Sequence, residues 1–537
     1  MANIAAVPPS ARRWLIAIAV MSSAVMEVLD TSVVNVSLPH IAGSLSSTVD
    51  EATWVLTSYI VANAIILPIT GWLSNYFGRK RLLMTVVTGF TLSSVLCGLA
   101  PSLPLLILFR VMQGLTGGGL QPLSQAVLLE EYPHEERGKA MAFWGMGIVA
   151  APVLGPTLGG WITDNYSWRW VFYINLPIGI LSLILISAFI YDPPYLKRGN
   201  MRVDGWGLGM LAVGMGALQI MFDKGQEDDW FGSRFIIILA IVAGVLLTGF
   251  IVRELRVKQP LVKLSLFKYR AFSAGIAMVT VLGFVMYGSL VLLPLFMQEL
   301  LGWSAATAGV WTSPRGIATA CCMPFVGYLL GKKWDARWML FIGLIIASAA
   351  FFGYSTMNLQ SGTWDLLVHQ INQGVGQTLL FVPLTIVIME PIPKEDIAYA
   401  TSLYSVTRNI GSSMGISFVT TWVARRSQFH QSRLSGHISL YNLQTQQALT
   451  QLRMMFMQHG ADGTTATHQA LAAIYGSVQQ QATLLSFVDV FYLMGWLFLF
   501  TTPLVLLMRK PKSSSSTPVV VLERRSQPRP PVGAILH

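Results

Sequence analysis

The stretch "GWLSNYFGRKR", residues 71–81, joins two apolar segments through a short turn that is rich in glycine and in cations. Gly71 and Gly78 permit backbone angles that other residues avoid, which suits a tight turn. Its three consecutive cations suit contact with anionic lipid or with helix C-termini, or serve simply to anchor the topology. The flanking segments, 54–74 and 82–100, are each about as long as a membrane-crossing helix. The stretch therefore predicts a cytoplasmic turn between two transmembrane helices.

The composition of the whole chain agrees with a membrane protein. Of 537 residues, 53% are hydrophobic and 11% are charged, whereas an ordinary soluble domain has roughly 25% charged residues. Apolar runs of about 20 residues recur along the chain, the length that crosses a ~30 Å hydrocarbon core. We predict an all-α integral membrane fold with fourteen transmembrane helices at 14–36, 54–74, 82–100, 104–127, 140–162, 169–190, 205–222, 234–252, 272–296, 306–330, 338–357, 365–389, 402–424 and 485–508.

The net charge of +11 does not indicate a nucleic-acid partner, because the basic residues occupy alternate loops and form no single patch. Loops rich in Lys and Arg face the cytoplasm, so these loops and both termini are predicted to be cytoplasmic. The loop at 226–233 belongs to the opposite side and is acidic. Cys97, Cys321 and Cys322 all fall in apolar runs, which predicts no disulfide framework.

A repeat divides the chain. Gln113 and Gly114 recur as Gln373 and Gly374, 260 positions later, and 71–81 has a fainter echo at an offset of 256. The longer offset maps the fourth predicted span onto the twelfth, so two six-helix halves flank an inserted helix pair. Two like-oriented halves are typical of alternating-access transporters that hold substrate near the membrane midplane. Repeats also occur in channels and in membrane proteins that transport nothing.

Four stretches together resemble a known family. The turn at 71–81 resembles the loop signature of the major facilitator superfamily, and "FRVMQGLTGGGLQP" (109–122) resembles its helix-four motif. "GIVAAPVLGPTLGG" (147–160) is similar to the helix-five motif of its drug-exporting antiporters. "WRWVFYINLPIG" (168–179) is similar to the fourteen-helix drug:proton antiporters of the EmrB/QacA type, and most to the EmrB branch. The resemblance covers about 14–508.

The resemblance assigns gating and structural roles to two of these motifs. Where the loop signature has an acidic residue, this chain has Asn75, so a charged latch would become a neutral hydrogen bond. In the helix-five motif, glycines four apart allow close helix approach and prolines favour a bend, although ordinary helix packing has the same pattern. The resemblance implies a helix that pivots between the halves and limits proton leak. The predicted gating and structural residues are Gly71, Asn75, Gly78, Arg79, Lys80, Pro152, Gly155, Pro156 and Gly159.

Two carboxylates lie in the first apolar span. Glu27 and Asp30 are three residues apart and so share a helix face. A carboxylate at the bilayer centre costs about 2.5 kcal/mol or more, so such groups face a water-filled cavity or a partner. Asp30 and Arg110 each lie about six residues, or ~9 Å, below the outer surface, which permits pairing. We predict that Asp30, Glu27 and Arg110 couple transport to protons; a static ion pair between two helices is the alternative.

Polar and aromatic side chains in other spans are candidates for substrate contact. Neutral amides in a cavity can orient a ligand without a fixed charge, and they can equally bridge helices. The candidates are Asn35, Asn63, Gln113, Gln121, Gln125, Tyr287, Trp311, Asn372, Gln373 and Gln377. No nucleotide-binding, hydrolase or metalloprotease motif appears in the sequence. We therefore predict no enzyme activity, no catalytic residue, no cofactor and no metal, and a proton gradient as the source of energy.

Residues 425–484 form the one long segment between predicted spans, and their apolar residues have helical spacing, which predicts short amphipathic helices on the outer face. The resemblance implies that this loop docks a periplasmic adaptor that works with an outer-membrane channel; a solvated cap without a partner is the alternative. The predicted organisation is a cytoplasmic N-terminus (1–13), an N-terminal half (14–190), an inserted pair with linkers (191–271), a C-terminal half (272–508) and a disordered cytoplasmic tail (509–537).

Together these features predict a proton-driven multidrug efflux pump in a bacterial inner membrane. It would export hydrophobic or amphipathic toxic compounds by alternating access, as the inner-membrane part of a tripartite system, and so contribute to antibiotic resistance. One alternative is a dedicated exporter of an endogenous metabolite, such as a fatty acid or a siderophore. Another is a membrane receptor or scaffold that transports nothing.

Overall fold

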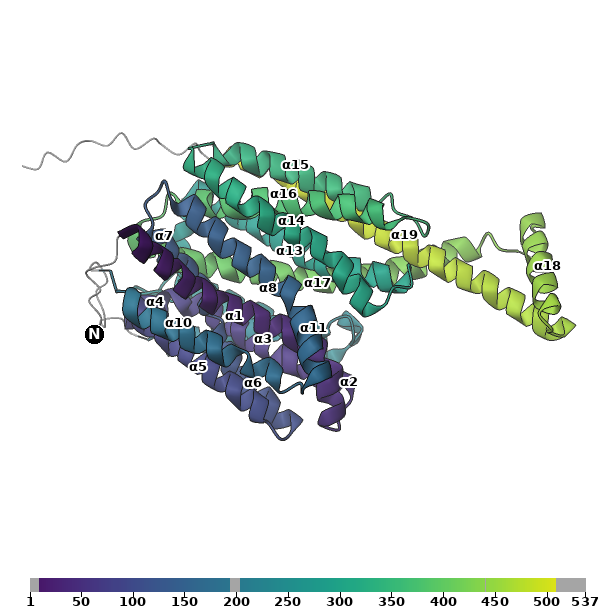
Figure 1. The fold of residues 1–537 in the computed structure, drawn as a ribbon, viewed down its shortest axis with the longest axis horizontal. Coiled ribbons are helices and arrows are strands. Elements are labelled where there is room, and N and C mark those ends of the chain that lie inside the picture. Colours follow the sequence, from purple (N-terminus) through teal and green to yellow (C-terminus); the bar gives the residue numbers. More distant parts are fainter. Residues whose placement is uncertain (1–8, 194–202, 440, 509–537) are drawn as a thin grey trace, which may run out of the picture.

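The computed structural model describes residues 9–193, 203–439 and 441–508, and within them every regular element is a helix. The predicted tail at 509–537 and most of the N-terminal segment lie outside the described residues. The N-terminal half contains α1 (Pro9–Ser44), α2 (Val49–Ala52), α3 (Trp54–Ile66), η2 (Leu67–Ile69), α4 (Thr70–Phe77), α5 (Arg79–Leu99), α6 (Leu103–Gly117), α7 (Leu120–Glu131), α8 (Arg137–Asn165), α9 (Trp170–Tyr173) and α10 (Asn175–Phe189) (Figure 1).

The remainder of the chain continues the bundle (Figure 1). An intermediate segment contains α11 (Gly205–Lys224), η3 (Trp230–Gly232), α12 (Arg234–Glu254) and η4 (Leu264–Lys268). The C-terminal half contains α13 (Arg270–Glu299), α14 (Ala305–Gly331), α15 (Ala336–Tyr354), α16 (Thr363–Met389), η5 (Lys394–Asp396), α17 (Ile397–Ser435), α18 (Leu443–Gln458) and α19 (Gly463–Leu507).

The helices pack as two groups with an inserted pair. In the first group α1 packs on α7, α8 and α10, α3 packs on α6, and α5 packs on α6 and α10. In the second, α13 packs on α17, α16 packs on α14 and α15, and α19 packs on α13, α15 and α17. The pair α11 and α12 pack on each other, and α11 also touches α3 and α17, one helix from each group. This is the predicted arrangement of two halves and an insertion.

A charged cap joins the start of α11 to the end of α12. Asp204 caps α11 by accepting a hydrogen bond from the Gly207 N–H at 3.1 Å, and Arg253 of α12 donates to the same carboxylate at 2.6 Å. The hydrogen bond from Arg253 holds the pKa of Asp204 below its usual range. A cap and an ion pair at one carboxylate fix the ends of both helices together.

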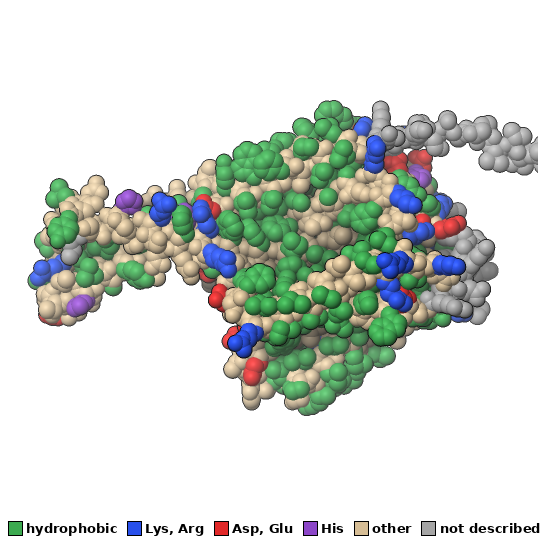
Figure 2. Space-filling model, turned by 180° about the vertical axis from the view of Figure 1, so that it is seen from behind, with side chains coloured by type: hydrophobic (Ala, Val, Ile, Leu, Met, Phe, Trp, Pro, Cys, Tyr) green, Lys and Arg blue, Asp and Glu red, His purple; other side chains and the backbone are tan. Residues whose placement is uncertain are grey.

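Twelve helices among the described residues are long and apolar enough to cross a membrane. The fourteen predicted spans all fall on helices, but α14 and α17 are outside this set of twelve. α17 is rich in Ser and Thr, and it packs between other helices, where polar side chains find partners. The number of spans therefore stays a prediction. Hydrophobic side chains cover the middle of the bundle, and charged ones gather toward its two ends (Figure 2).

Two predicted spans are interrupted helices. The second predicted span is divided into α3, η2 and α4, and Pro68 lies in the 3-10 turn between the two α-helices. The fourth is divided into α6 and α7 at Gly118 and Gly119. Gly78, between α4 and α5, has φ of +88°, a conformation that favours glycine. The turn predicted at 71–81 is therefore present, and the breaks fall at glycine and proline.

The prediction of a loop of short helices at 425–484 is wrong for most of that segment. α17 continues unbroken to Ser435, and α19 begins at Gly463, so among the described residues of this segment α18 is the one short helix. At 1.5 Å per residue, the 45 residues of α19 extend about 68 Å, more than twice the hydrocarbon core. α19 is therefore too long to lie wholly within the apolar layer. We call residues 425–484 the helical arm.

The helical arm projects from one end of the bundle, and the start of α1 and the end of α19 both lie at the other end (Figure 1). We call the latter the terminal end. At the base of the arm, Asp489 of α19 accepts from Arg426 of α17 at 2.6 Å and lies 2.7 Å from His430. These contacts join the two long helices where they leave the bundle.

Candidate functional site

Asp30 of α1 is fully buried inside the N-terminal half and contacts three nitrogen donors. Arg110 Nη1 donates to Asp30 Oδ2 at 2.6 Å. Gln113 Nε2 and Asn175 Nδ2 donate to Asp30 Oδ1 at 3.0 and 2.7 Å. The structure thus brings together the carboxylate and the arginine that the sequence places at equal depth. Asn175 was not among the predicted residues.

Arg110 is held from several sides, and its position depends on a glycine. Its Nε donates to the Val55 carbonyl at 3.0 Å, its Nη1 donates to Gln113 Oε1 at 2.7 Å, and its Cζ lies 4.2 Å from the centroid of the Tyr59 ring. A Cβ at Gly114 would lie 2.4 Å from the Tyr59 carbonyl. Glycine therefore permits the close approach of α3 and α6 that presents Tyr59 to the guanidinium.

Glu27, one turn earlier on α1, belongs to a second buried cluster. Asn63 Nδ2 donates to Glu27 Oε1 at 2.9 Å. Arg408 of α17 lies within electrostatic reach of Glu27 and donates to Gln121 Oε1 at 2.5 Å. Because α17 belongs to the C-terminal half, this cluster joins the two halves. Glu27 thus faces the C-terminal half, whereas Asp30 is surrounded by residues of the N-terminal half.

The remaining predicted contact residues are dispersed. Gln125 is fully buried, and no partner among the described residues meets its amide. Gln373 and Gln377 are also buried, and Gln373 Nε2 donates to Ser289 Oγ at 2.9 Å. Tyr287 and Trp311 are half-buried. Asn35 and Asn372 are exposed and belong to neither buried cluster.

The glycine turn at the terminal end lies against the other half. A Cβ at Gly71 would lie 2.7 Å from the Tyr399 Cα and 2.8 Å from the Ala398 carbonyl. Asn75 is buried beside the Tyr399 hydroxyl, which it meets as a neutral partner. Ser402 Oγ donates to the carbonyls of Leu67 and of Pro68, the latter at 3.1 Å.

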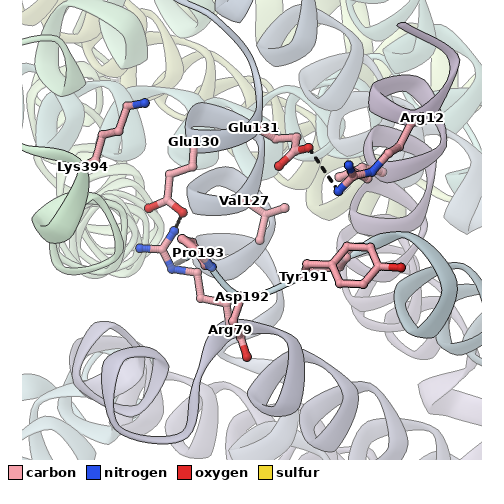
Figure 3. Close-up of a pocket in the computed structure, with 11 residues that line it drawn as sticks. Arg12, Arg79, Val127, Glu130, Glu131, Tyr191, Asp192, Pro193 and Lys394 are labelled. Carbon is pink, nitrogen blue, oxygen red and sulfur yellow. Dashed lines mark ion pairs between the residues drawn. The ribbon is translucent and has the colours of Figure 1, made fainter. Parts of the chain in front are cut away.

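Arg79 of the turn lines a pocket at the terminal end. Arg79 forms a buried ion pair with Glu130 of α7, and Arg12 lies 3.8 Å from Glu131 (Figure 3). Lys394, from the C-terminal half, lines the same pocket. The backbone N–H of Lys80 donates to Asp192 at 2.9 Å, and its Nζ donates to the Ser187 carbonyl at 2.6 Å. The predicted cations therefore connect three segments of the N-terminal half.

The helix-five motif places α8 between two neighbours. A Cβ at Gly155 would lie 2.2 Å from Ser32 Oγ, and one at Gly159 would lie 3.0 Å from the Val33 carbonyl, so both glycines face α1. Ser32 Oγ donates to the Pro152 carbonyl at 3.4 Å, and Pro156 follows one turn later inside α8. α8 also packs on α14 of the other half. The glycine face itself belongs to the N-terminal half.

The model of the Major Facilitator Superfamily matches residues 20–416. The chain belongs to this superfamily. It is 40% identical over 487 residues to the multidrug export protein EmrB of Haemophilus influenzae, covering 90% of this chain and 93% of the relative. It is 39% identical to the fatty acid resistance protein FarB of Neisseria gonorrhoeae, covering 90% and 94%. It is 36% identical to EmrB of Escherichia coli K12, covering 93% and 95%.

Solved structures of this superfamily share the fold. The human organic anion transporter MFSD10 superposes with a TM-score of 0.57 at 12% identity, covering 92% of this chain and all of the other. The proton:xylose symporter XylE gives 0.54 at 16% identity, covering 89% and 95%. The family model and the sequence relatives confirm the resemblance to EmrB-type transporters. This superfamily member is a multi-pass protein of the bacterial inner membrane and a transporter, not an enzyme.

Sequence reasoning missed two polar residues of the buried clusters of this superfamily member. Asn175 lies inside the quoted stretch 168–179, in the largely apolar run that follows Arg169. Arg408 lies inside the predicted span at 402–424. Each carried a usable signal, because a polar or charged side chain within a membrane helix faces a cavity or a partner.

Proposed function

We propose that the protein exports hydrophobic and amphipathic toxic compounds in exchange for protons, with Asp30 as the coupling carboxylate. Similarity to EmrB-type multidrug exporters over about nine-tenths of the chain supports the export of many compounds. The observation that carries the coupling proposal is the burial of Asp30 among three donors, one of them a guanidinium. A buried carboxylate with such partners has a proton affinity that depends on their positions.

The proposed cycle follows from that dependence. When Arg110, Gln113 and Asn175 hold Asp30 as observed, the ionised carboxylate is stabilised. A rearrangement that withdraws these donors favours proton uptake, and their return favours release. One proton that moves inward through ~100 mV supplies about 2.3 kcal/mol. That energy sustains an almost fifty-fold gradient of a neutral compound, at about 1.4 kcal/mol per factor of ten.

Through the cluster of Glu27, Gln121 and Arg408, substrate binding acts on α1, the helix that carries Asp30. Glu27 and Asp30 lie on α1 one turn apart, and Arg408 comes from the opposite half. A compound that enters between the halves and separates Arg408 from Gln121 would alter the surroundings of Glu27. We assign substrate contact to Asn63, Gln121 and Gln125, which belong to this region of the N-terminal half or are buried beside it.

The other segments of the chain have proposed roles in the same transport cycle. The halves at 14–190 and 272–508 move against each other, and the pair within 191–271 lies against both through α11. The helical arm docks a periplasmic adaptor that connects to an outer-membrane channel. The chain needs no cofactor, because the proton gradient supplies the energy. A dedicated exporter of an organic acid is a second candidate, supported by similarity to the fatty acid resistance protein FarB.

Proton release from energised inside-out vesicles tests the proposal. A panel of hydrophobic cations, anions and neutral drugs, none of them protonophores, is added to vesicles with the wild-type protein or Asp30→Asn. We expect several compounds to release protons from wild-type vesicles and none from the variant, at equal protein levels. Full drug-driven release by Asp30→Asn would remove Asp30 from the mechanism. No release by any compound in verified wild-type vesicles would contradict the export of drugs for protons.

A further inference from the structure

The C-terminal half contains a buried arginine without a carboxylate. Arg315 of α14 is 8% exposed, and its Nη1 donates to Ser289 Oγ at 3.3 Å. The same hydroxyl accepts from Gln373 Nε2 at 2.9 Å, and Tyr354 donates to Gln373 Oε1 at 3.1 Å. Among the described residues, no Asp or Glu side chain pairs with Arg315. We call Arg315, Ser289 and Gln373 the Arg315 cluster.

The internal repeat identifies what this cluster lacks. Gln373 lies 260 positions after Gln113, and Ser289 lies 259 positions after Asp30. In the N-terminal half Gln113 Nε2 donates to Asp30, and in the C-terminal half Gln373 Nε2 donates to Ser289. The same contact is therefore made twice, with a carboxylate in one half and a hydroxyl in the other.

Arg315 also has a counterpart in the N-terminal half. Arg315 lies 256 positions after Tyr59, the offset of the fainter echo. A Cβ at Gly114 would meet the Tyr59 carbonyl at 2.4 Å, and a Cβ at Gly374 would meet the Arg315 carbonyl at 2.4 Å. Arg315 thus has the backbone position of the aromatic residue that lies beneath Arg110 in the other half.

Compared with the N-terminal half, the C-terminal half has a buried cation at the place of the buried ion pair. At the register of Arg110, 260 positions later, stands the neutral Gln370. At this place in the C-terminal half the guanidinium of Arg315 remains, and Ser289 stands where the N-terminal half has its carboxylate. An isolated buried charge is costly, and guanidinium groups bind carboxylates with a geometry that lysine cannot offer. An incoming anion would complete the arrangement already present around Asp30.

We propose that the Arg315 cluster binds the carboxylate of amphipathic organic acids that the protein exports. This inference rests on the proposed export function and adds a substrate class and a site to it. The guanidinium supplies a charged donor and the Gln373 amide a neutral one. Both donate to the Ser289 hydroxyl, whose own O–H donates to the Met286 carbonyl at 2.8 Å. Gln373 corresponds to Gln113 in the repeat, and the Arg315 guanidinium takes the part of the Arg110 guanidinium, so the carboxylate of the ligand would replace the side chain of Asp30.

Aromatic side chains beside the cluster suit the apolar part of such a ligand. Trp311 precedes Arg315 by four residues on α14 and so lies on the same helix face. Its ring is half-buried, and its centroid lies 6.0 Å from that of Trp303. A charged head at Arg315 with a hydrocarbon tail along these rings accounts for both features.

Binding of a matched pair of probes to the purified full-length protein tests the site. The probes are radiolabelled dodecanoate and methyl dodecanoate, which differ in charge but share the hydrocarbon chain. We expect the wild-type protein to prefer the carboxylate by about ten- to a hundredfold, the range for hydrogen bonds to charged groups. Arg315→Gln should abolish the preference. Ser289→Asp should abolish it too, because a carboxylate on α13 would occupy Arg315 as Asp30 occupies Arg110.

A matched variant makes the result specific. Ser289→Asn has nearly the same size as Ser289→Asp but no charge, so it should weaken the carboxylate preference without abolishing it. Ser289→Asp should also raise the melting temperature, because it neutralises a buried cation. Equal affinity of the wild-type protein for both probes would overturn the inference. So would an undiminished preference in a folded Ser289→Asp protein, or full competition by chloride without a carboxylate preference.

The binding test is independent of the transport test. Drug-driven proton release with cationic and neutral compounds, together with no carboxylate preference, would reject the Arg315 site and leave the export proposal standing. A carboxylate preference that depends on Arg315, together with no proton release by any compound, would reject drug:proton exchange and support the site.

Discussion

Asp30 owes its position to donors from two other helices, and one of them was not foreseen. Asn175 Nδ2 lies 2.7 Å from Asp30 and 3.0 Å from Ser94 Oγ, at the start of α10. Asn175→Ala should lower the free energy of unfolding by about 1.5–3 kcal/mol, the usual worth of a hydrogen bond to a charged group, and should slow exchange severalfold. Thermal melting and drug-driven proton release measure the two effects. Asn372→Ala, at an exposed position, serves as the control and should change neither.

The buried pair also shows what one sequence can and cannot predict about single residues. Equal depth in two helices predicts that Asp30 can meet Arg110, and the structure places the two side chains 2.6 Å apart. Depth alone does not say which direction a neutral amide faces. Of the amides predicted to contact substrate, Asn63 lies against Glu27 in a buried cluster, whereas Asn35 is exposed. Side-chain direction around a helix depends on neighbours that lie far away in the sequence.

At the level of helices, α8 offers two glycines in contrasting surroundings. A Cβ at Gly155 would lie 2.2 Å from Ser32 Oγ, whereas a Cβ at Gly160 would have no neighbour within 4 Å. Gly155→Ala should therefore lower stability by about 1–3 kcal/mol through overpacking and should reduce exchange. Gly160→Ala should be neutral or stabilising by up to about 1 kcal/mol, since alanine favours helix. Equal melting temperatures and activities for the two variants would contradict the close packing of α8 on α1.

The helices themselves were predictable where apolar length decides them. All fourteen predicted spans fall on helices, because runs of about 20 apolar residues have few alternatives in a membrane. Their ends were less predictable. α19 continues through Gln-rich sequence that has no apolar run, and only its packing on α17 and α18 reveals why it stays helical. Hydropathy marks where a helix enters the membrane, not where it ends.

For the molecule as a whole, the helical arm projects away from the helix bundle that holds the buried clusters (Figure 1). α18 lies at the tip of the arm, at the opposite end from both described termini (Figure 1). Replacing residues 441–460 by a short flexible linker should leave drug-driven proton release in vesicles unchanged. The same variant should lose drug resistance in cells with an outer membrane, if an adaptor docks there. Resistance equal to wild type, at equal protein levels, would show that the tip of the arm is a solvated cap.

Movement of one half against the other should depend on the contact at the terminal end. Gly71 of α4 faces the α17 backbone so closely that a Cβ would lie 2.7 Å from the Tyr399 Cα. Gly71→Ala should force the halves apart there, because neither backbone has a flexible group to move aside. We expect faster hydrogen exchange at the start of α17 and at least tenfold slower drug-driven proton release. Gly43→Ala, on α1 with no neighbour within 4 Å, should leave both unchanged. If Gly71→Ala also left both unchanged, closure of the two halves at this turn would not be part of the transport cycle.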